Sequence, residues 1–215
     1  MSYKIILFDL DGTLTDPGLG ITNSVKYALE RFGIHVGDNK QLYPFVGPPL
    51  IDSFMKFYGF SREQAEKAVV CFREYFKDKG IFENVPYAGI KKLLAELKAA
   101  EKTLVIATSK PEVFAKQILE HFGLAEYFSF VAGSTLDETR TVKSEVIEYA
   151  LDSIGPVNLA ECVMVGDREH DVLGAKAVGM DSIGVLYGYG SREEFEKAGA
   201  AHIVENMETL RKILI

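Results

Sequence analysis

Hydrophobic residues in this chain occur in two patterns, short continuous runs and longer stretches with a helical repeat. The short runs are rich in β-branched and aromatic residues, and they predict strands at 3–9, 102–108, 128–133, 162–167, 182–188 and, more weakly, 201–206. Their hydrophobicity is continuous rather than alternating, which is typical of parallel strands buried on both faces.

Amphipathic helical patterns separate these runs. One predicted helix buries the face formed by Ile90, Leu93, Leu94 and Leu97, and a second buries the face formed by Ile147, Ala150, Leu151 and Ile154. Regular alternation of strands and helices after residue 86 indicates right-handed crossovers. The sequence therefore predicts an α/β fold, a doubly wound, Rossmann-like core around a parallel sheet.

The segment between the first strand and residue 85 breaks this rhythm, because it shows helical stripes only. These stripes are Ile21, Val25, Leu29 and Phe32, followed by Ala65, Ala68, Phe72 and Phe76. Residues 17–84 carry nine Lys/Arg against eight Asp/Glu, so the remainder is left with a net charge of −8 in a chain of −7. Pro/Gly-containing stretches flank the segment. We expect an all-helical domain at 17–84, inserted into a core formed by residues 1–16 and 85–215.

Composition narrows the classes of function. The 215 residues, 47% hydrophobic and 26% charged, are typical of a globular protein, and no Lys/Arg run marks a surface for nucleic acid or an anionic membrane. The two cysteines, Cys71 and Cys162, lie far apart in apolar stretches and are expected to be buried free thiols. Neither a signal peptide nor a membrane-spanning stretch is visible, so a cytoplasmic protein is expected, as a monomer or homodimer.

Chemically active side chains follow the predicted strands. Asp9 and Asp11 end the first strand, Thr108 and Ser109 the second, and Asp167 the fourth, with Asp171 four residues later and Lys143 opening the helix after the third. Ligands of open α/β sheets bind at the carboxyl ends of the strands. Several carboxylates, a hydroxyl and a lysine at one edge match the needs of Mg²⁺ and a phosphate group.

These segments resemble the four motifs of the haloacid dehalogenase superfamily, in order. The stretch "DLDGTLTD" is similar to its DxDGT motif, "VIATSK" to its second motif, Lys143 to the third and "VMVGDREHD" to a GDxxxD fourth motif. The resemblance covers nearly the whole chain, and the helical insert resembles the cap domain of the family. Within the superfamily, the phosphoglycolate phosphatases and related small-molecule phosphatases look most similar.

This resemblance implies roles for each position. Asp9 is expected to be the nucleophile that forms an aspartyl-phosphate, and Asp11 the general acid and base. Thr108, Ser109 and Lys143 are expected to hold the phosphoryl group, with Gly12 and Thr13 forming the turn that carries Asp11. The implied Mg²⁺ ligands are Asp9, the carbonyl of Asp11, Asp167 and Asp171, the last directly or through water. A small phosphorylated molecule is the expected substrate.

Alternative interpretations differ in strength. A calcium loop at "DLDG" fails because Gly12 occupies loop position 4, not 6. The stretch "GYGSRE" lacks the third glycine of a dinucleotide loop and is expected to be a loop near the site. A 5′-nucleotidase, a pyrophosphatase, a β-phosphoglucomutase-like phosphotransferase and a non-catalytic phosphate-sensing module remain alternatives.

Three further positions carry weaker expectations. The loop "FVGPPL" at 45–50 is a candidate for substrate selection in the insert. His170 is expected to lie at a solvated rim more readily than in the site. Glu101 stands where the similar phosphatases commonly have a glycine that ends a helix in the left-handed conformation.

Overall fold

The computed structural model describes residues 3–136 and 139–215, which fall into two compact units. The first unit comprises Met1–Thr15 and Pro86–Ile215, and the second is Asp16–Val85. The sequence places the insert at 17–84, within one residue of these bounds at each end. Two short strands, β2 (Thr15–Asp16) and β3 (Val85–Pro86), pair where the chain leaves and re-enters the first unit. Strands of two residues are too short to leave a hydrophobic pattern.

A six-stranded sheet forms the first unit, with strand order β5-β4-β1-β6-β7-β8. Its strands are β1 (Ile5–Phe8), β4 (Thr103–Pro111), β5 (Phe130–Ser134), β6 (Cys162–Gly166), β7 (Asp181–Val185) and β8 (His202–Val204). Every described pairing is parallel, for example Leu7 with both Val105 and Met164. The predicted parallel α/β fold is confirmed. Strand β1 lies between β4 and β6, the two strands whose carboxyl ends also carry candidate site residues.

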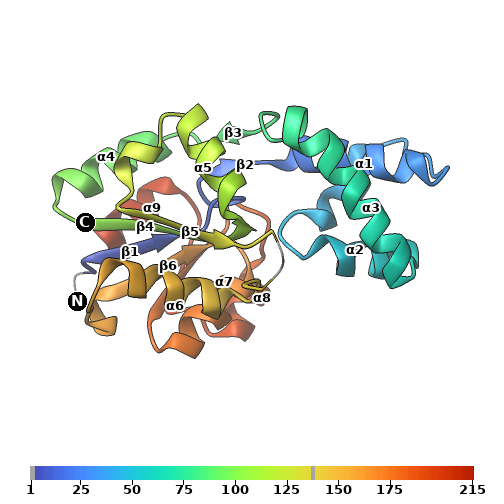
Figure 1. Cartoon of the computed structure of the whole chain (residues 1–215). Coiled ribbons are helices and arrows are strands. Elements are labelled where there is room, and N and C mark those ends of the chain that lie inside the picture. The colour runs from blue at the N-terminus through green and yellow to red at the C-terminus, as the bar shows by residue number, and fades with distance from the viewer. Residues whose placement is uncertain (1–2, 137–138) are drawn as a thin grey trace. The chain divides into compact units, whose positions relative to one another are not determined.

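Helices cover both faces of this sheet (Figure 1). The helices α4, α5 and α9 lie on one face, and α6, α7 and α8 lie on the other. Their bounds are α4 (Ile90–Ala99), α5 (Glu112–His121), α6 (Lys143–Ile154), α7 (Glu169–Val178), α8 (Arg192–Ala198) and α9 (Met207–Leu214). The predicted apolar faces pack on the sheet, because the four named positions of α4 and the first three of α6 are buried. Short 3-10 turns at Ala125–Tyr127 and Leu159–Glu161 precede β5 and β6.

The second unit is helical, as its stripes predict. It contains α1 (Gly18–Arg31), α2 (Leu50–Tyr58) and α3 (Arg62–Tyr75), with a 3-10 segment at Asn39–Phe45 and a π-helical turn at Phe76–Gly80. Stacked and edge-on aromatic rings form part of its core, with Phe54 centred 5.0 Å from Phe45 and 5.8 Å from Phe60. Ring pairs of this kind add to the burial of apolar surface.

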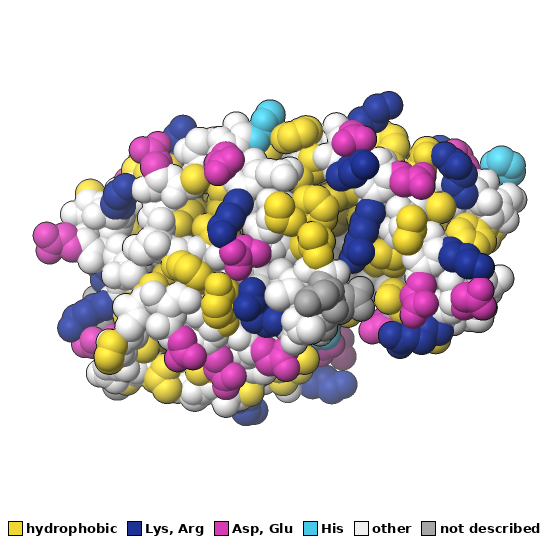
Figure 2. All heavy atoms as spheres, in the orientation of Figure 1, with side chains coloured by type: hydrophobic (Ala, Val, Ile, Leu, Met, Phe, Trp, Pro, Cys, Tyr) yellow, Lys and Arg dark blue, Asp and Glu magenta, His cyan; other side chains and the backbone are white. Residues whose placement is uncertain are grey.

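The distribution of surface charge and the burial of the two cysteines bear on two expectations from the sequence. On the face drawn in Figure 2, acidic and basic side chains are interspersed, and the absence of nucleic-acid binding stays a prediction. Both cysteines are free, but only Cys162 is buried, so the expected burial of Cys71 was wrong in degree. Within residues 3–136 and 139–215, no helix is long and apolar enough to cross a bilayer.

Candidate active site

Strand β1 delivers Asp9 to the carboxyl edge of the sheet. The Asp9 N–H continues the strand pairing by donating to the carbonyl of Val165 at 2.9 Å. Its carboxylate accepts the N–H of Leu10 at Oδ1 (2.7 Å), which leaves Oδ2 directed to other partners. The backbone then folds back on itself, because the N–H groups of Leu14 and Thr15 both donate to the carbonyl of Leu10.

Glycine is required inside this turn. Gly12 has a φ of +79°, a left-handed conformation that side chains other than glycine rarely adopt. A Cβ atom at this position would also lie 2.1 Å from Oδ2 of Asp167. The first motif and the end of β6 therefore approach each other closely, which brings Gly12 and Asp167, 155 residues apart in sequence, into one site.

Three carboxylates and one ammonium group converge at this edge. Oxygens of Asp9, Asp167 and Asp171 all lie within 4.8 Å of one another. The Lys143 ammonium, from the first residue of α6, lies 2.7 Å from Asp171 and 3.2 Å from Asp9, and it donates to the carbonyl of Ala107 at 3.0 Å. The sequence predicted all four of these side chains as site residues.

This cluster carries more negative than positive charge. Burial, followed by the charges of Asp171 and Asp9, raises the pKa of Asp167 well above its ordinary value. Burial also raises the pKa of Asp171 to about 6, although Lys143 acts in the opposite direction. For Lys143, burial alone would lower the pKa, but the charges of Asp171 and Asp9 prevail and raise it. One lysine does not balance three buried carboxylates, so hard oxygen donors with uncompensated charge fit a divalent cation such as Mg²⁺.

The Asp11 carboxylate is held apart from that trio. Its Oδ2 forms an ion pair with Lys110, and Oδ1 is buried without a hydrogen-bond partner in the described part of the chain. Burial raises the pKa of Asp11, while Lys110 opposes the rise. A carboxyl group that retains a proton more readily than usual is suited to proton transfer. Sequence reasoning placed Lys110 at the end of a strand but missed this contact.

The predicted phosphate-binding positions lie around the same edge. Thr108 is buried and its hydroxyl accepts the N–H of Lys110 at 3.2 Å, whereas Ser109 is exposed. Thr13 is buried, and its hydroxyl donates to Oδ1 of Asp167 at 3.4 Å. Thr13 therefore contacts a carboxylate, a role that the sequence did not indicate.

Residues at the margin behave as rim or capping groups. His170 is exposed, and Arg168 pairs with Glu194 at 3.0 Å. Asp171 also accepts the Arg168 N–H at 3.1 Å, so it caps the start of α7 while facing Lys143. The loop after β7 lies near the site as expected, because the Tyr189 N–H donates to Oδ2 of Asp167 at 2.9 Å.

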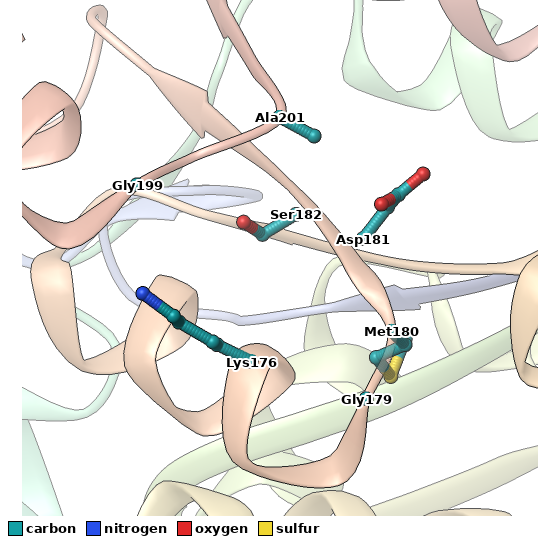
Figure 3. A pocket seen from close by; sticks show the side chains of 7 residues that line it. All are labelled: Lys176, Gly179, Met180, Asp181, Ser182, Gly199 and Ala201. Atoms are coloured by element: carbon teal, nitrogen blue, oxygen red, sulfur yellow. The ribbon is translucent and has the colours of Figure 1, made fainter.

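A separate hollow lies at the opposite end of β7 (Figure 3). It is lined by Lys176, Gly179, Met180, Asp181, Ser182, Gly199 and Ala201. Asp181 is the first residue of β7 and accepts the Tyr3 hydroxyl at 2.8 Å. None of the candidate site residues described above lines this hollow.

A family model described as haloacid dehalogenase-like hydrolase matches residues 6–185. This chain belongs to that family. The hydrolase is 47% identical to a 5′-nucleotidase of Pseudomonas aeruginosa, over 100% of this chain and 96% of that protein. It is 38% identical to the tyrosine-protein kinase PtkA of Mycobacterium tuberculosis, over 99% of this chain and 73% of that protein.

Two further similarities concern the hydrolase and named phosphatases. A phosphoglycolate phosphatase of Neisseria meningitidis is 30% identical, over 87% of this chain and 82% of that protein. The crystal structure of a predicted phosphatase from Clostridium acetobutylicum superimposes with a TM-score of 0.94 at 52% identity, over 99% of this chain and 98% of that chain. The resemblance inferred from the four motifs is therefore confirmed at the level of the family.

Proposed function

We propose that this hydrolase is a Mg²⁺-dependent phosphatase that cleaves a small-molecule phosphate monoester through an aspartyl-phosphate. The observation that carries the proposal is the convergence of Asp9, Asp167 and Asp171 around Lys143, whose ammonium contacts two of the three. In this proposal, Asp9, Asp167, Asp171 and the carbonyl of Asp11 would hold the ion. Bound Mg²⁺ would neutralise charge on the carboxylates and on the phosphoryl oxygens.

In the first step, an oxygen of Asp9 attacks phosphorus. An Asp9–phosphorus bond forms, the bond from phosphorus to the substrate oxygen breaks, and Asp11 gives its proton to the departing oxygen. Lys143 reduces the repulsion between the attacking carboxylate and the phosphate, because its ammonium lies 3.2 Å from Asp9 Oδ2. Thr108 and the Ser109 N–H orient the phosphoryl oxygens.

In the second step, Asp11 takes a proton from water as the water oxygen attacks phosphorus. The Asp9–phosphorus bond breaks, and inorganic phosphate and the free Asp9 carboxylate result. The raised pKa of Asp11 suits both directions of this proton transfer. We propose that the helical unit is a cap that excludes bulk water and selects substrates, with residues 45–50 as the selecting loop.

Nucleoside 5′-monophosphates are the first substrates to test, and phosphoglycolate is the second. The 5′-nucleotidase relative is 47% identical over the whole chain, compared with 30% over 87% for the phosphoglycolate phosphatase. Pyrophosphate and sugar phosphates complete the set of alternatives. The proposed site of action is the cytoplasm.

The test is a phosphate-release assay over these compounds and p-nitrophenyl phosphate, with Mg²⁺ and with excess chelator. We expect turnover that requires Mg²⁺ and is fastest for one compound class. Absence of turnover with every compound would refute the phosphatase proposal. A parallel incubation with ATP labelled at its γ-phosphate tests the alternative suggested by the tyrosine kinase relative. Label on tyrosine side chains that survives hydroxylamine would indicate phosphotransfer, whereas an aspartyl-phosphate of the hydrolytic route would be released by that treatment.

A further inference from the structure

The loop at residues 187–190, between β7 and α8, packs directly on Asp167. A Cβ atom at Gly188 would lie 2.4 Å from the Asp167 Cβ and 2.3 Å from the carbonyl oxygen of Gly12. A Cβ atom at Gly190 would lie 2.1 Å from the carbonyl oxygen of Asp167. None of these three separations is compatible with a side chain, so the two glycines are what allow the loop to pack on Asp167.

Polar contacts fix the same carboxylate from two directions. The Tyr189 N–H donates to Oδ2 at 2.9 Å, and the Thr13 hydroxyl donates to Oδ1 at 3.4 Å. The loop is also joined to the turn that carries Thr13, because the partly buried Tyr187 hydroxyl donates to the Thr13 carbonyl at 3.1 Å. Each carboxylate oxygen of Asp167 thus accepts one hydrogen bond. The two donors belong to the loop and to the turn, which are themselves joined by the hydrogen bond from Tyr187 to Thr13.

This arrangement has a consequence for metal binding. Asp167 is 1% exposed, so its side chain cannot exchange these donors for water. A carboxylate oxygen offers two lone pairs, and a single donor on each oxygen leaves the other pair for a cation. Outer contacts that orient a ligating carboxylate commonly change metal affinity by about 10- to 100-fold when they are removed.

We infer that the 187–190 loop is a positioning element that holds Asp167 in its ligating orientation before the metal arrives. The inference rests on the proposed Mg²⁺ site. Gly188 acts by allowing the close approach, Tyr189 through its backbone N–H, and Tyr187 by fastening the loop to the turn. The "GYG" pattern, which lacks the third glycine of a dinucleotide loop, is explained by this contact with the fourth motif.

The test is isothermal titration calorimetry of the metal-free protein with Mg²⁺ and Mn²⁺, without substrate. We compare Gly188→Ala with Gly37→Ala, a matched control at which a Cβ would meet nothing within 4 Å. Neither glycine has a positive φ, so the two variants differ in crowding rather than in backbone strain. We expect Gly188→Ala to raise the Kd for the metal ion by about tenfold or more, and Gly37→Ala to leave it unchanged.

A second variant, Tyr187→Phe, tests the same inference if Gly188→Ala does not fold. Tyr187→Phe keeps the ring and its edge contact with Tyr87 but removes the hydroxyl donor to Thr13. We expect this variant to show the circular dichroism spectrum of the wild type and to have a Kd that is raised several-fold. Wild-type affinity in Tyr187→Phe, or in a folded Gly188→Ala, would overturn the positioning role. Failure of the wild-type protein to bind either ion would instead refute the proposed metal site.

Discussion

Lys143 and Asp171 form a buried ion pair, with 2.7 Å between the ammonium nitrogen and Oδ1. Only 4% of the lysine side chain and 2% of the aspartate side chain are exposed. The same ammonium also faces Asp9, so one cation contacts two carboxylates, one directly after β1 and one in the first turn of α7. Structure and chemistry are coupled here, since the group proposed to assist phosphoryl transfer also compensates buried charge.

The first prediction concerns this lysine. Lys143→Met leaves buried carboxylates without their partner, and breaking such a pair typically costs about 3–5 kcal/mol. We expect the metal-free variant to lose stability on that scale in urea unfolding and to recover part of it when Mg²⁺ is added. Lys67→Met, which removes an exposed pair with Glu63, is the control and should leave stability close to that of the wild type. Equal stability of the two variants would contradict the prediction.

Replacing the proposed nucleophile is the second prediction. Asp9→Asn keeps the size of the side chain but removes the attacking carboxylate, so turnover should fall by about a thousandfold or more. Circular dichroism and the melting temperature should stay close to wild type, because an amide oxygen can still accept the Leu10 N–H. Activity retained in this variant, measured by phosphate release, would assign the nucleophile to another residue.

Lys110 provides the third prediction. It holds one oxygen of Asp11, the proposed proton donor to the departing oxygen, so Lys110→Met should misplace that donor. We expect kcat to fall by about tenfold or more for an alkyl phosphate, which needs the proton, and much less for p-nitrophenyl phosphate, which does not. Lys110→Arg should recover part of the loss. An equal decrease for both substrates would mean that Lys110 acts only on the structure.

The fourth prediction is a pH dependence of metal binding. Burial raises the pKa of Asp171 to about 6, so this carboxyl takes up a proton as the pH falls through that value. A protonated carboxyl is a poor ligand, and the proton on Asp171 should therefore lower Mg²⁺ affinity by up to about tenfold for each pH unit below about 6. Calorimetric titrations across this range measure the slope. Asp171→Asn should bind weakly with a flatter profile, and an unchanged slope would exclude Asp171 as the titrating group.

The fifth prediction tests a strained helix end. Glu101 has a φ of +57° and is the single non-glycine residue with positive φ in the described ranges. It follows α4 in a Schellman arrangement, in which the Lys102 N–H donates to the Leu97 carbonyl and the Glu101 N–H to the Lys98 carbonyl. Glu101→Gly should raise stability by about 0.5–1 kcal/mol in urea unfolding, whereas Glu101→Ala should not.

Hydrophobic patterning was sufficient to predict the sheet, because parallel strands buried on both faces leave continuous apolar runs. The run before Asp9 and the run before Asp167 became the paired strands β1 and β6. The helical stripes were equally informative, and the expected anomaly at Glu101 coincides with its left-handed backbone. The order of chemically active residues along the chain identified the carboxylate cluster, since strand ends of a parallel sheet meet at one edge.

Contacts made by backbone groups or by long side chains could not be predicted in the same way. The Tyr189 contact with Asp167 uses a backbone N–H, which every residue except proline possesses, so no residue type signals it. The pairing of Lys110 with Asp11 depends on the direction in which a flexible side chain leaves an irregular part of β4. The half-exposure of Cys71 similarly depends on tertiary packing and not on its apolar neighbours.

Pairing of β2 with β3 has a practical consequence for protein engineering. The two points at which the polypeptide leaves and re-enters the sheet-containing unit are hydrogen-bonded neighbours, and the Tyr87 N–H also donates to the Leu14 carbonyl at 3.0 Å. Adjacent strands lie about 5 Å apart, a gap that a turn of two residues can close. Replacement of the helical unit by a short turn, or by the corresponding unit of a relative, would therefore leave every strand of the six-stranded sheet uncut.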